Sequence, residues 1–287
     1  MDSTSRWSLG AHSGPVWAFW GDTTSLYSAS EDWSIQIWNL QSSHSIGRLS
    51  GHSAGVTALW GDITTLYSGS NDHTIRVWDR SRKQCIAVWW GHVTGVLDLW
   101  GDAAKLYVAN MDGTIKVLNR ATGKSLEIWS KHIAAVHTLW GDATTLYSGD
   151  ADGIIKVWDL AKGRWKDTLV GHTNRVLDLW GDSTTLYSTG SDKTIKVWNR
   201  ATGRCIATWM GSSRPIFALW GDATLIYSGD ADGLIRAWER ASGRCMGAWV
   251  EHFGDIRCLW GNGMNLYSGG IDREVLAWRL KDQSLNP

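Results

Sequence analysis

The sequence has few of the residues that usually mark a secreted or metal-binding protein. Its 287 residues include only 3 prolines and 4 cysteines. The cysteines form no C-x-x-C pair and show no metal-ligand spacing; they are Cys85, Cys205, Cys245 and Cys258. The polar start, MDSTSRWSLG, lacks the apolar segment of a secretory signal. We therefore expect a reducing compartment, the cytoplasm or alternatively the nucleus, and no bound metal.

An excess of charge and long apolar runs are also missing. Lys plus Arg and Asp plus Glu both number 28, so the net charge is zero. Nucleic-acid binding draws most of its affinity from a basic face, and a membrane span needs about 20 apolar residues. The sequence shows no phosphate-binding glycine loop, His/Cys cluster or unrepeated acid pair. We expect no nucleic acid, membrane, cofactor or catalytic residue.

Tryptophan is abundant, at 22 residues, and it recurs with a fixed period of 40. Trp-Gly-Asp starts at Trp20, Trp60, Trp100, Trp140, Trp180 and Trp220, and Trp260-Gly261-Asn262 is the seventh copy. An aspartate follows the same period: Asp32, Asp72, Asp112, Asp152, Asp192, Asp232 and Asp272. A second tryptophan does so at Trp38, Trp78, Trp158, Trp198, Trp238 and Trp278, with Leu118 in the third place. Such a period predicts an array of supersecondary units.

Each unit reads as four short strands. In the second unit, VTALW, LYSGS, TIRVWD and CIAVW are strand-length runs separated by Gly-, Asp- and Asn-rich turns. No window long enough for a helix shows a 3.6-residue period. A four-stranded antiparallel blade cannot bury both of its faces alone, so the blades are expected to stack around an axis.

The chain ends predict a closed ring. The last unit reaches its third strand at Trp278 and stops too soon for a full fourth one, whereas Ser5 to Leu9 aligns with the fourth strand of the other units. We expect this N-terminal strand, residues 5–9, to complete the last blade, because closure protects the sheet edges.

The units resemble WD40 repeats, as in GHSAGVTALWGDITTLYSGSNDHTIRVWD from Gly51 to Asp79. The resemblance covers essentially the whole chain, with repeats at about 10–49, 50–89, 90–129, 130–169, 170–209, 210–249 and 250–287. It implies an all-β fold, a closed seven-bladed β-propeller that forms a single domain over residues 1–287. We expect the propeller to be monomeric.

The resemblance also assigns a structural tetrad to each repeat: a His before the first strand, a Ser in the second strand, the turn Asp and the third-strand Trp. The sets are His12, Ser28, Asp32, Trp38; His52, Ser68, Asp72, Trp78; His132, Ser148, Asp152, Trp158; His172, Ser188, Asp192, Trp198; and His252, Ser268, Asp272, Trp278. Ser, His and Asp also make nucleophilic triads. Five copies favour a framework instead, because a catalytic site occurs once.

Two units depart from the tetrad. The third has Val108 and Leu118 in place of Ser and Trp, and the sixth has Ser212 in place of His. We expect His92 and Asp232 to be left short of partners, and blades three and six to be the least rigid.

The Trp-Gly-Asp series has two interpretations. Packing between blades is favoured, and an aromatic ring facing a ligand in the channel is the alternative. We expect its Asp side chains to form a solvated charge rim with Arg80, Arg120, Arg200 and Arg240, with each exposed pair contributing about 0–1 kcal/mol.

Residues that do not repeat are the candidates for function. In WD proteins the top face, which carries the loop before the first strand and the turn after the second, binds partner proteins or peptides. By resemblance the partner-binding residues are Trp17, Glu31, Trp33, Leu97, Met111, His137, Arg175, Leu177, Arg214, Phe217, Asp255, Arg257 and Ile271. Large apolar groups edged by charges are typical of interaction surfaces.

The leading hypothesis is therefore a non-enzymatic protein-interaction scaffold or substrate-recruiting adaptor. A propeller that binds a small molecule or catalyses a reaction in its central channel, near His137, is one alternative. A designed or recently amplified propeller without an evolved partner is another.

Overall fold

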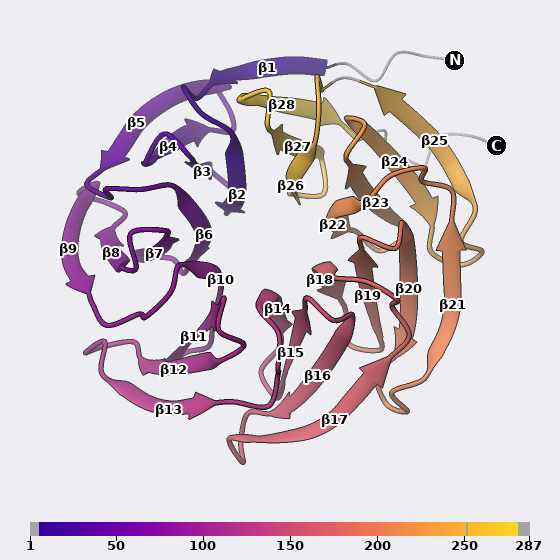
Figure 1. Ribbon diagram of the computed structural model, residues 1–287. Coiled ribbons are helices and arrows are strands. Elements are labelled where there is room, and N and C mark those ends of the chain that lie inside the picture. Colours follow the sequence, from indigo (N-terminus) through magenta and orange to yellow (C-terminus); the bar gives the residue numbers. More distant parts are fainter. Residues whose placement is uncertain (1–5, 251, 281–287) are drawn as a thin grey trace.

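The computed structural model describes residues 6–250 and 252–280. They form seven four-stranded antiparallel sheets arranged as a ring (Figure 1). This confirms the predicted all-β, seven-bladed propeller. Within the described residues, no helix is long and apolar enough to span a bilayer.

The strands fall into four concentric sets. The innermost are β2 (Val16–Gly21), β6 (Val56–Gly61), β10 (Val96–Gly101), β14 (Val136–Gly141), β18 (Val176–Gly181), β22 (Ile216–Gly221) and β26 (Ile256–Gly261). The second are β3 (Ser25–Ser30), β7 (Thr65–Ser70), β11 (Lys105–Asn110), β15 (Thr145–Asp150), β19 (Thr185–Gly190), β23 (Leu225–Asp230) and β27 (Asn265–Gly270). The third are β4 (Ser34–Asn39), β8 (Ile75–Asp79), β12 (Ile115–Asn119), β16 (Ile154–Asp159), β20 (Thr194–Asn199), β24 (Leu234–Glu239) and β28 (Glu274–Arg279). The outermost are β5 (His44–Ser50), β9 (Gln84–Trp89), β13 (Ser125–Trp129), β17 (Arg164–Val170), β21 (Cys205–Met210), β25 (Cys245–Val250) and β1 (Arg6–Ala11).

Blade two, β6 to β9, shows why the repeat folds this way. Five of the six residues of β7 are buried, because both faces of the second strand are covered by neighbouring blades. The outer strand β9 has no buried residue. Asp62 fixes the turn between β6 and β7 by accepting from the backbone N–H groups of Thr64 and Thr65, both at 2.8 Å. Such Asx turns need no residue beyond the Asp itself.

The N-terminal strand closes the ring as predicted. β1 pairs antiparallel with β28, with Arg6 opposite Trp278 and Trp7 opposite Ala277. The two strands lie side by side in Figure 1, and they join the ends of the chain in one sheet. Ser5, the first residue of the predicted strand, lies outside the described residues. Closure removes two sheet edges that an open array would expose.

The Trp-Gly-Asp series packs each blade on the next. A Cβ added to Gly101 of blade three would lie 2.8 Å from the Trp60 ring of blade two, and one added to Gly21 would lie 2.9 Å from Trp260. The same approach occurs at Gly61, Gly141, Gly181, Gly221 and Gly261. The glycine is therefore required for close contact with an indole, and inter-blade packing explains the whole series.

The expected charge rim is wrong. Arg80 of blade two lies over the Trp20 ring of blade one at 4.7 Å, pairs with Asp22 and donates to the Tyr27 hydroxyl at 3.2 Å. Arg120, Arg200 and Arg240 repeat the stack on the indole and the ion pair at three more junctions. The four Arg side chains are only 9% to 16% exposed. These Arg side chains therefore link neighbouring blades from nearly buried positions, because the Trp ring that each one covers shields it from solvent.

At the other three junctions, a leucine stands in the position of this arginine. Leu40, Leu160 and Leu280 share hydrophobic clusters with Trp260, Trp100 and Trp220 respectively. The indole thus receives either a guanidinium or an aliphatic cover, and both exclude water from the junction.

We expect Gly101→Ala to lower the free energy of unfolding by about 1–3 kcal/mol, because the new methyl group overpacks against Trp60. Urea denaturation measures the loss. Repeating the substitution in a Trp60→Leu background should give a smaller loss, since the smaller side chain leaves room for the methyl group. Equal losses in both backgrounds would contradict the proposed contact.

Candidate functional site

Five of the predicted top-face residues form one network at the mouth of the channel. The Arg257 guanidinium lies 3.8 Å from the centroid of the Phe217 ring and 5.2 Å from that of Trp17. Asp255 pairs with Arg257, and Trp17 Nε1 donates to Glu31 Oε2 at 2.8 Å. These residues come from blades six, seven and one, so the network exists only because the ring is closed.

The geometry gives this network the properties of a preorganised anchor. A guanidinium over two aromatic faces gains cation–π attraction. The Asp255 carboxylate pairs with the guanidinium, and the Glu31 carboxylate accepts from the Trp17 indole N–H. Arg257 Nε is buried and has no hydrogen-bond partner among the described residues. Trp17, Phe217 and Arg257 remain half-buried. Each therefore keeps surface that a bound molecule can cover.

The other predicted residues lie apart from this network. Arg214 is tied to Asp232 at 3.2 Å. His137, Leu97 and Leu177 occupy the matching second position of the inner strands in blades four, three and five, and all are half-buried. Burial and then the charge of Arg175 lower the pKa of His137. The turn residues on the same face are exposed: Trp33, Met111 and Ile271.

The tetrads assemble as predicted in blades one, two, five and seven. In blade two, Trp78 Nε1 donates to Ser68 Oγ at 2.8 Å, Ser68 Oγ lies 2.7 Å from His52 Nε2, and His52 Nδ1 lies 2.7 Å from Asp72 Oδ2. Since the Trp N–H can only donate, the Ser hydroxyl donates to Nε2, and the His donates from Nδ1. The Trp N–H, the Ser O–H and the His Nδ1–H are therefore all engaged in hydrogen bonds within the tetrad.

The pKa shifts of the Asp and His side chains agree with these hydrogen-bond directions. Hydrogen bonds from Thr74, Ser53 and His52 outweigh burial and hold the pKa of Asp72 at about 2. Burial lowers the pKa of His52. The result is an ionised Asp beside a neutral His. Ser68 is completely buried, so its hydroxyl cannot reach a substrate carbonyl as a nucleophile would.

The tetrad assigned to blade four needs correction. Asp150, not Asp152, accepts from His132 Nδ1, at 2.5 Å. Ser148 and Trp158 take their predicted places. Asp150 ends β15, where blades one and two have Ser30 and Ser70. A carboxylate at this position reaches the His directly, so the turn residue is not needed.

In blade six too, an Asp at the end of the second strand replaces the turn Asp. The expectation that Asp232 is short of partners is wrong. Ser212 Oγ donates to Asp230 Oδ2 at 2.9 Å, and Arg236 also pairs with Asp230. Asp232 accepts from Ser213 and Arg214. Here an Asp at the end of β23 takes over the buried position, and the turn Asp moves to the surface with partners of its own.

Blade three is left incomplete, as predicted for His92. His92 Nδ1 and Thr94 Oγ1 are buried without a partner among the described residues, and burial lowers the pKa of His92 to about 4. In each of the other six blades the turn N–H donates to the carbonyl of the preceding loop, as Asn71 does to Gly55. No such bond from Met111 is found in the described part of blade three.

The structure also contains an unrepeated acid pair, which contradicts the sequence-based expectation. Asp98 and Asp178 hold the third position of β10 and β18, where the other blades have Ala, Thr or Cys. Each spans a junction: Asp98 Oδ2 accepts from Leu139 N at 2.6 Å, and Asp178 Oδ2 from Leu219 N at 2.7 Å. Comparison of the repeats position by position would have exposed the pair.

Burial dominates the electrostatics of this acid pair. It raises the pKa of Asp98 and of Asp178 to about 7, although backbone N–H donors oppose it. Hydrogen bonding to the Thr138 side chain also opposes the rise in the pKa of both carboxyl groups. Both side chains keep some accessible surface, yet dense surroundings leave little water to solvate a charge. Within the described ranges, no group of three or more His, Cys, Asp or Glu side chains suits a metal ion.

The fold and its repeated tetrads define a β-propeller of the WD-repeat class. The family described as WD domain, G-beta repeat (WD40) matches residues 3–39, 43–79, 123–159 and 163–199, more than half of the chain. The chain belongs to the WD40 family, whose propellers are commonly protein-interaction scaffolds and generally not enzymes.

Among solved structures, the chain is similar to the crystal structure of the computationally designed Ika8 protein. The TM-score is 0.77 at 25% identity, over 95% of this chain and 98% of that one. No curated protein matches the chain.

We expect blade three to open more readily than blade two. Amides of residues 91–95 and 110–114 should exchange hydrogen faster than those of residues 51–55 and 70–74, because the loop of blade three lacks its tetrad and its turn bond. Hydrogen exchange read by mass spectrometry measures this. Blade six should be intermediate, since Asp230 restores part of the network. Equal protection in all three blades would refute the prediction.

The acid pair should make stability fall as pH rises. In the unfolded chain these carboxyls ionise near pH 3.8, but in the folded protein they hold protons up to about pH 7. Between these values the folded state binds more protons, so the free energy of unfolding decreases with rising pH. Asp98→Asn/Asp178→Asn should flatten that decrease in urea titrations at pH 4 to 8.

Comparing how the free energy of unfolding changes with pH in the wild type and in the double variant separates this effect from others. Each Asn turns an NH2 group toward a backbone N–H, which lowers stability equally at every pH. His92 acts in the opposite direction, because its depressed pKa removes stability as pH falls, and it does so in both proteins. Identical slopes for the two proteins would show that neither carboxyl is protonated in the fold.

Proposed function

We propose that this propeller is a non-enzymatic scaffold or adaptor that binds partner proteins or peptides through its top face. The observation that carries the proposal is the Arg257 stack between Trp17 and Phe217 at the channel mouth. Aromatic and Arg side chains, held in place and partly desolvated, are the residues that dominate protein-binding hot spots.

The network supports binding better than packing alone. None of its residues belongs to the tetrads or to the Trp-Gly-Asp series, so the fold does not demand them. Three inner strands provide an equivalent position without an aromatic ring or an arginine, at Thr57, Leu97 and Leu177. Thr57 shows the purely structural use of the position, since its hydroxyl donates to Val96 O at 2.5 Å.

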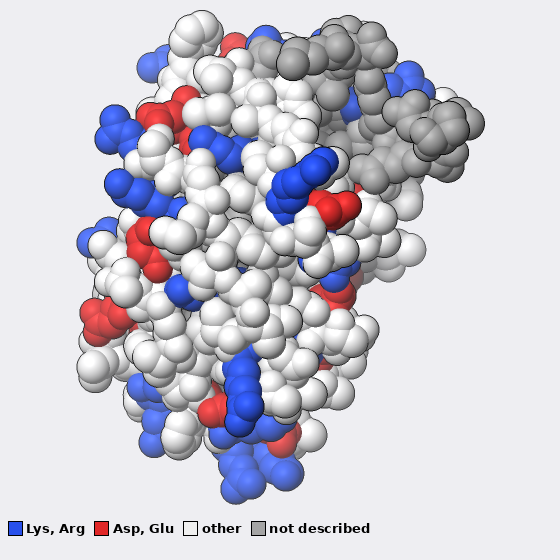
Figure 2. Space-filling view, turned by 90° about the vertical axis from the view of Figure 1, so that its right-hand side faces the viewer, with Lys and Arg blue, Asp and Glu red and all other residues white. Residues whose placement is uncertain are grey.

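Exposed apolar side chains extend the proposed surface beyond the channel mouth. Trp33 is 54% and Met111 is 55% exposed on the turns of blades one and three. Figure 2 looks onto the outer edge of the ring, where basic and acidic residues are interspersed and form no continuous basic field. That edge therefore lacks the basic surface that nucleic acid needs. Exposed thiols at Cys85, Cys205 and Cys245 suit a reducing compartment such as the cytoplasm.

The triple variant Trp17→Ala/Phe217→Ala/Arg257→Ala should weaken partner binding at least about tenfold, because it removes the anchors while leaving the tetrads intact. Affinity capture followed by titration of each recovered partner measures the loss.

The control is a matched triple variant on the opposite face, Ile63→Ala/Arg82→Ala/Met264→Ala, which removes two exposed apolar residues and one exposed Arg. Both variants must keep the unfolding temperature of the parent. If the same partners bind both variants equally, the top face is not the binding surface. If no partner is found, a propeller without an evolved partner is favoured.

A ligand of the central channel is a second candidate, and the acid pair is the observation that favours it. Asp98 and Asp178 place two partly exposed carboxyl groups on the innermost strands β10 and β18, and burial raises the pKa of both to about 7. A cationic or hydrogen-bonding small molecule would suit them. Binding that disappears in Asp98→Asn/Asp178→Asn but persists in the top-face variant would favour this candidate.

A further inference from the structure

The top face carries a positive charge without a counter-ion at the junction of blades four and five. Arg175 ends the loop before β18 and is exposed, and in the described part of the chain its guanidinium has no ion pair or hydrogen bond. His137, on β14 of the neighbouring blade, is half-buried, and among the described residues its ring has no hydrogen bond either. Burial and the charge of Arg175 lower the pKa of His137, so the imidazole beside this arginine is neutral. This corner of the channel mouth therefore presents N–H donors that lack an acceptor.

The equivalent corner of blades six and seven shows how the chain satisfies a charge in this position. Asp255 holds the place of Arg175 in the repeat, and Arg257, two residues further along, neutralises it. At blades four and five the sign of the loop residue is reversed. The place of Arg257 is taken by Leu177, which cannot serve as a counter-ion. The repeat thus keeps a charge at this position and omits the group that would pair with it.

The carboxylates of the top face do not neutralise Arg175. Glu31 accepts from an indole N–H at 2.8 Å, and Asp255 pairs with an arginine of its own blade. Asp192, on the turn of blade five, accepts from the tetrad histidine at 2.8 Å. Asp152, on the turn of blade four, is exposed, and it forms no ion pair within residues 6–250 and 252–280. The acceptor that Arg175 lacks is therefore left to a bound molecule.

Arg175 and His137 lie across the channel mouth from the Trp17 side of the aromatic network. The strands β14 and β18 stand on the opposite side of the ring from β2 (Figure 1). Two half-buried aliphatic side chains, Leu97 and Leu177, lie on the inner strands of blades three and five. A segment that crosses the mouth thus meets aromatic and aliphatic surface along its length and unpaired donors at one end.

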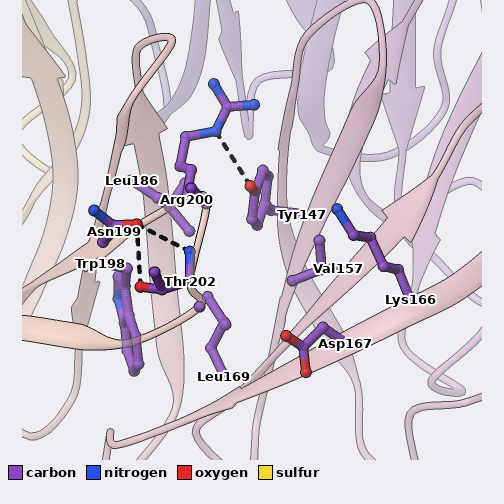
Figure 3. A pocket seen from close by; sticks show the side chains of 12 residues that line it. Tyr147, Val157, Lys166, Asp167, Leu169, Leu186, Trp198, Asn199, Arg200 and Thr202 are labelled. Carbon is purple, nitrogen blue, oxygen red and sulfur yellow. Dashed lines mark hydrogen bonds between the residues drawn. The ribbon is translucent and has the colours of Figure 1, made fainter.

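A small pocket at the same junction lies away from the channel mouth and is separate from this site. Figure 3 shows its residues, with Asp167 and Lys166 at one edge. Tyr147, Leu169 and Trp198 in its walls are only 1% to 4% exposed. The pocket therefore offers a partner little surface.

We propose that the partner segment bound by the top face carries an acidic side chain, Asp or Glu, whose carboxylate pairs with Arg175 and accepts a hydrogen bond from His137. This inference rests on the proposed function, because it names the chemistry of the segment that Trp17 and Phe217 anchor. Charge-assisted hydrogen bonds to a guanidinium are stronger than neutral ones, and a charge pair fixes the orientation of the segment. The partner is thus an apolar segment with an acidic residue at one end.

Peptides selected on the full-length propeller supply the probe. Random linear peptides displayed on phage are selected on wild type, and each selected peptide is titrated with its acidic residue intact or changed to the matching amide. The amide version should bind wild type at least about tenfold more weakly, because it keeps the shape and loses the charge. Arg175→Ala should weaken the acidic peptide by a similar factor and change the amide version little, since the two groups form one interaction.

Matched variants separate this pair from general charge effects. Arg214 is an exposed arginine of the same face that already pairs with Asp232 at 3.2 Å, so Arg214→Ala should affect the acidic and amide peptides equally. Arg175→Glu should reject the acidic peptide and bind a version with arginine at that position. His137→Phe keeps a ring but has no N–H, and it should weaken the acidic peptide more than the amide.

The outcomes distinguish this inference from the proposed function. The acidic partner is wrong, and the top-face scaffold stands, under two conditions taken together. The selected peptides must lose binding in Trp17→Ala/Phe217→Ala/Arg257→Ala, and they must either lack an acidic residue, bind equally well as the amide or bind Arg175→Ala as well as wild type. If no peptide is selected, or if those selected bind the triple variant equally well, both proposals fail.

Discussion

The contact between an indole and a glycine of the next blade is the constraint on which this ring depends. Trp60 lies on Gly101, and Trp260 lies on Gly21, so the seven contacts close into a circle. A blade has two apolar faces that it cannot bury alone. The indole supplies a large apolar area, and the glycine lets the neighbouring strand approach it. Because every blade both gives and receives this contact, each repeat needs its Trp and its Gly at the same place in the innermost strand.

Other interactions vary around that constraint without breaking it. Arg80 and its equivalents cover the indole with a guanidinium, whereas Leu160 and its equivalents cover it with an aliphatic group. The buried carboxylate of the tetrad comes from the turn in blade two and from the end of a strand in blade four. The ring therefore tolerates substitution wherever a second side chain can satisfy the same apolar surface or the same hydrogen-bond donor.

Places where the repeat is relaxed and nothing compensates are the candidates for function. Blade three leaves His92 Nδ1 buried without a hydrogen-bond partner among the described residues. The junction of blades four and five has a pocket beside Leu169 and Asp167. The channel mouth carries Arg257 between two aromatic rings that the framework does not need. A framework residue has an equivalent contact in several blades, whereas these features are found once.

The sequence by itself determined the fold, because the positions of Trp, Gly and Asp repeat without a gap and each residue type has one local use. It also located the departures at Val108, Leu118 and Ser212. Only the tertiary structure decided that Asp150 replaces Asp152, that Asp98 and Asp178 each accept from the backbone of the next blade, and that a pocket opens beside Leu169. Those outcomes depend on side chains from different blades, and the distance between blades is set by packing across the ring, which no single repeat encodes.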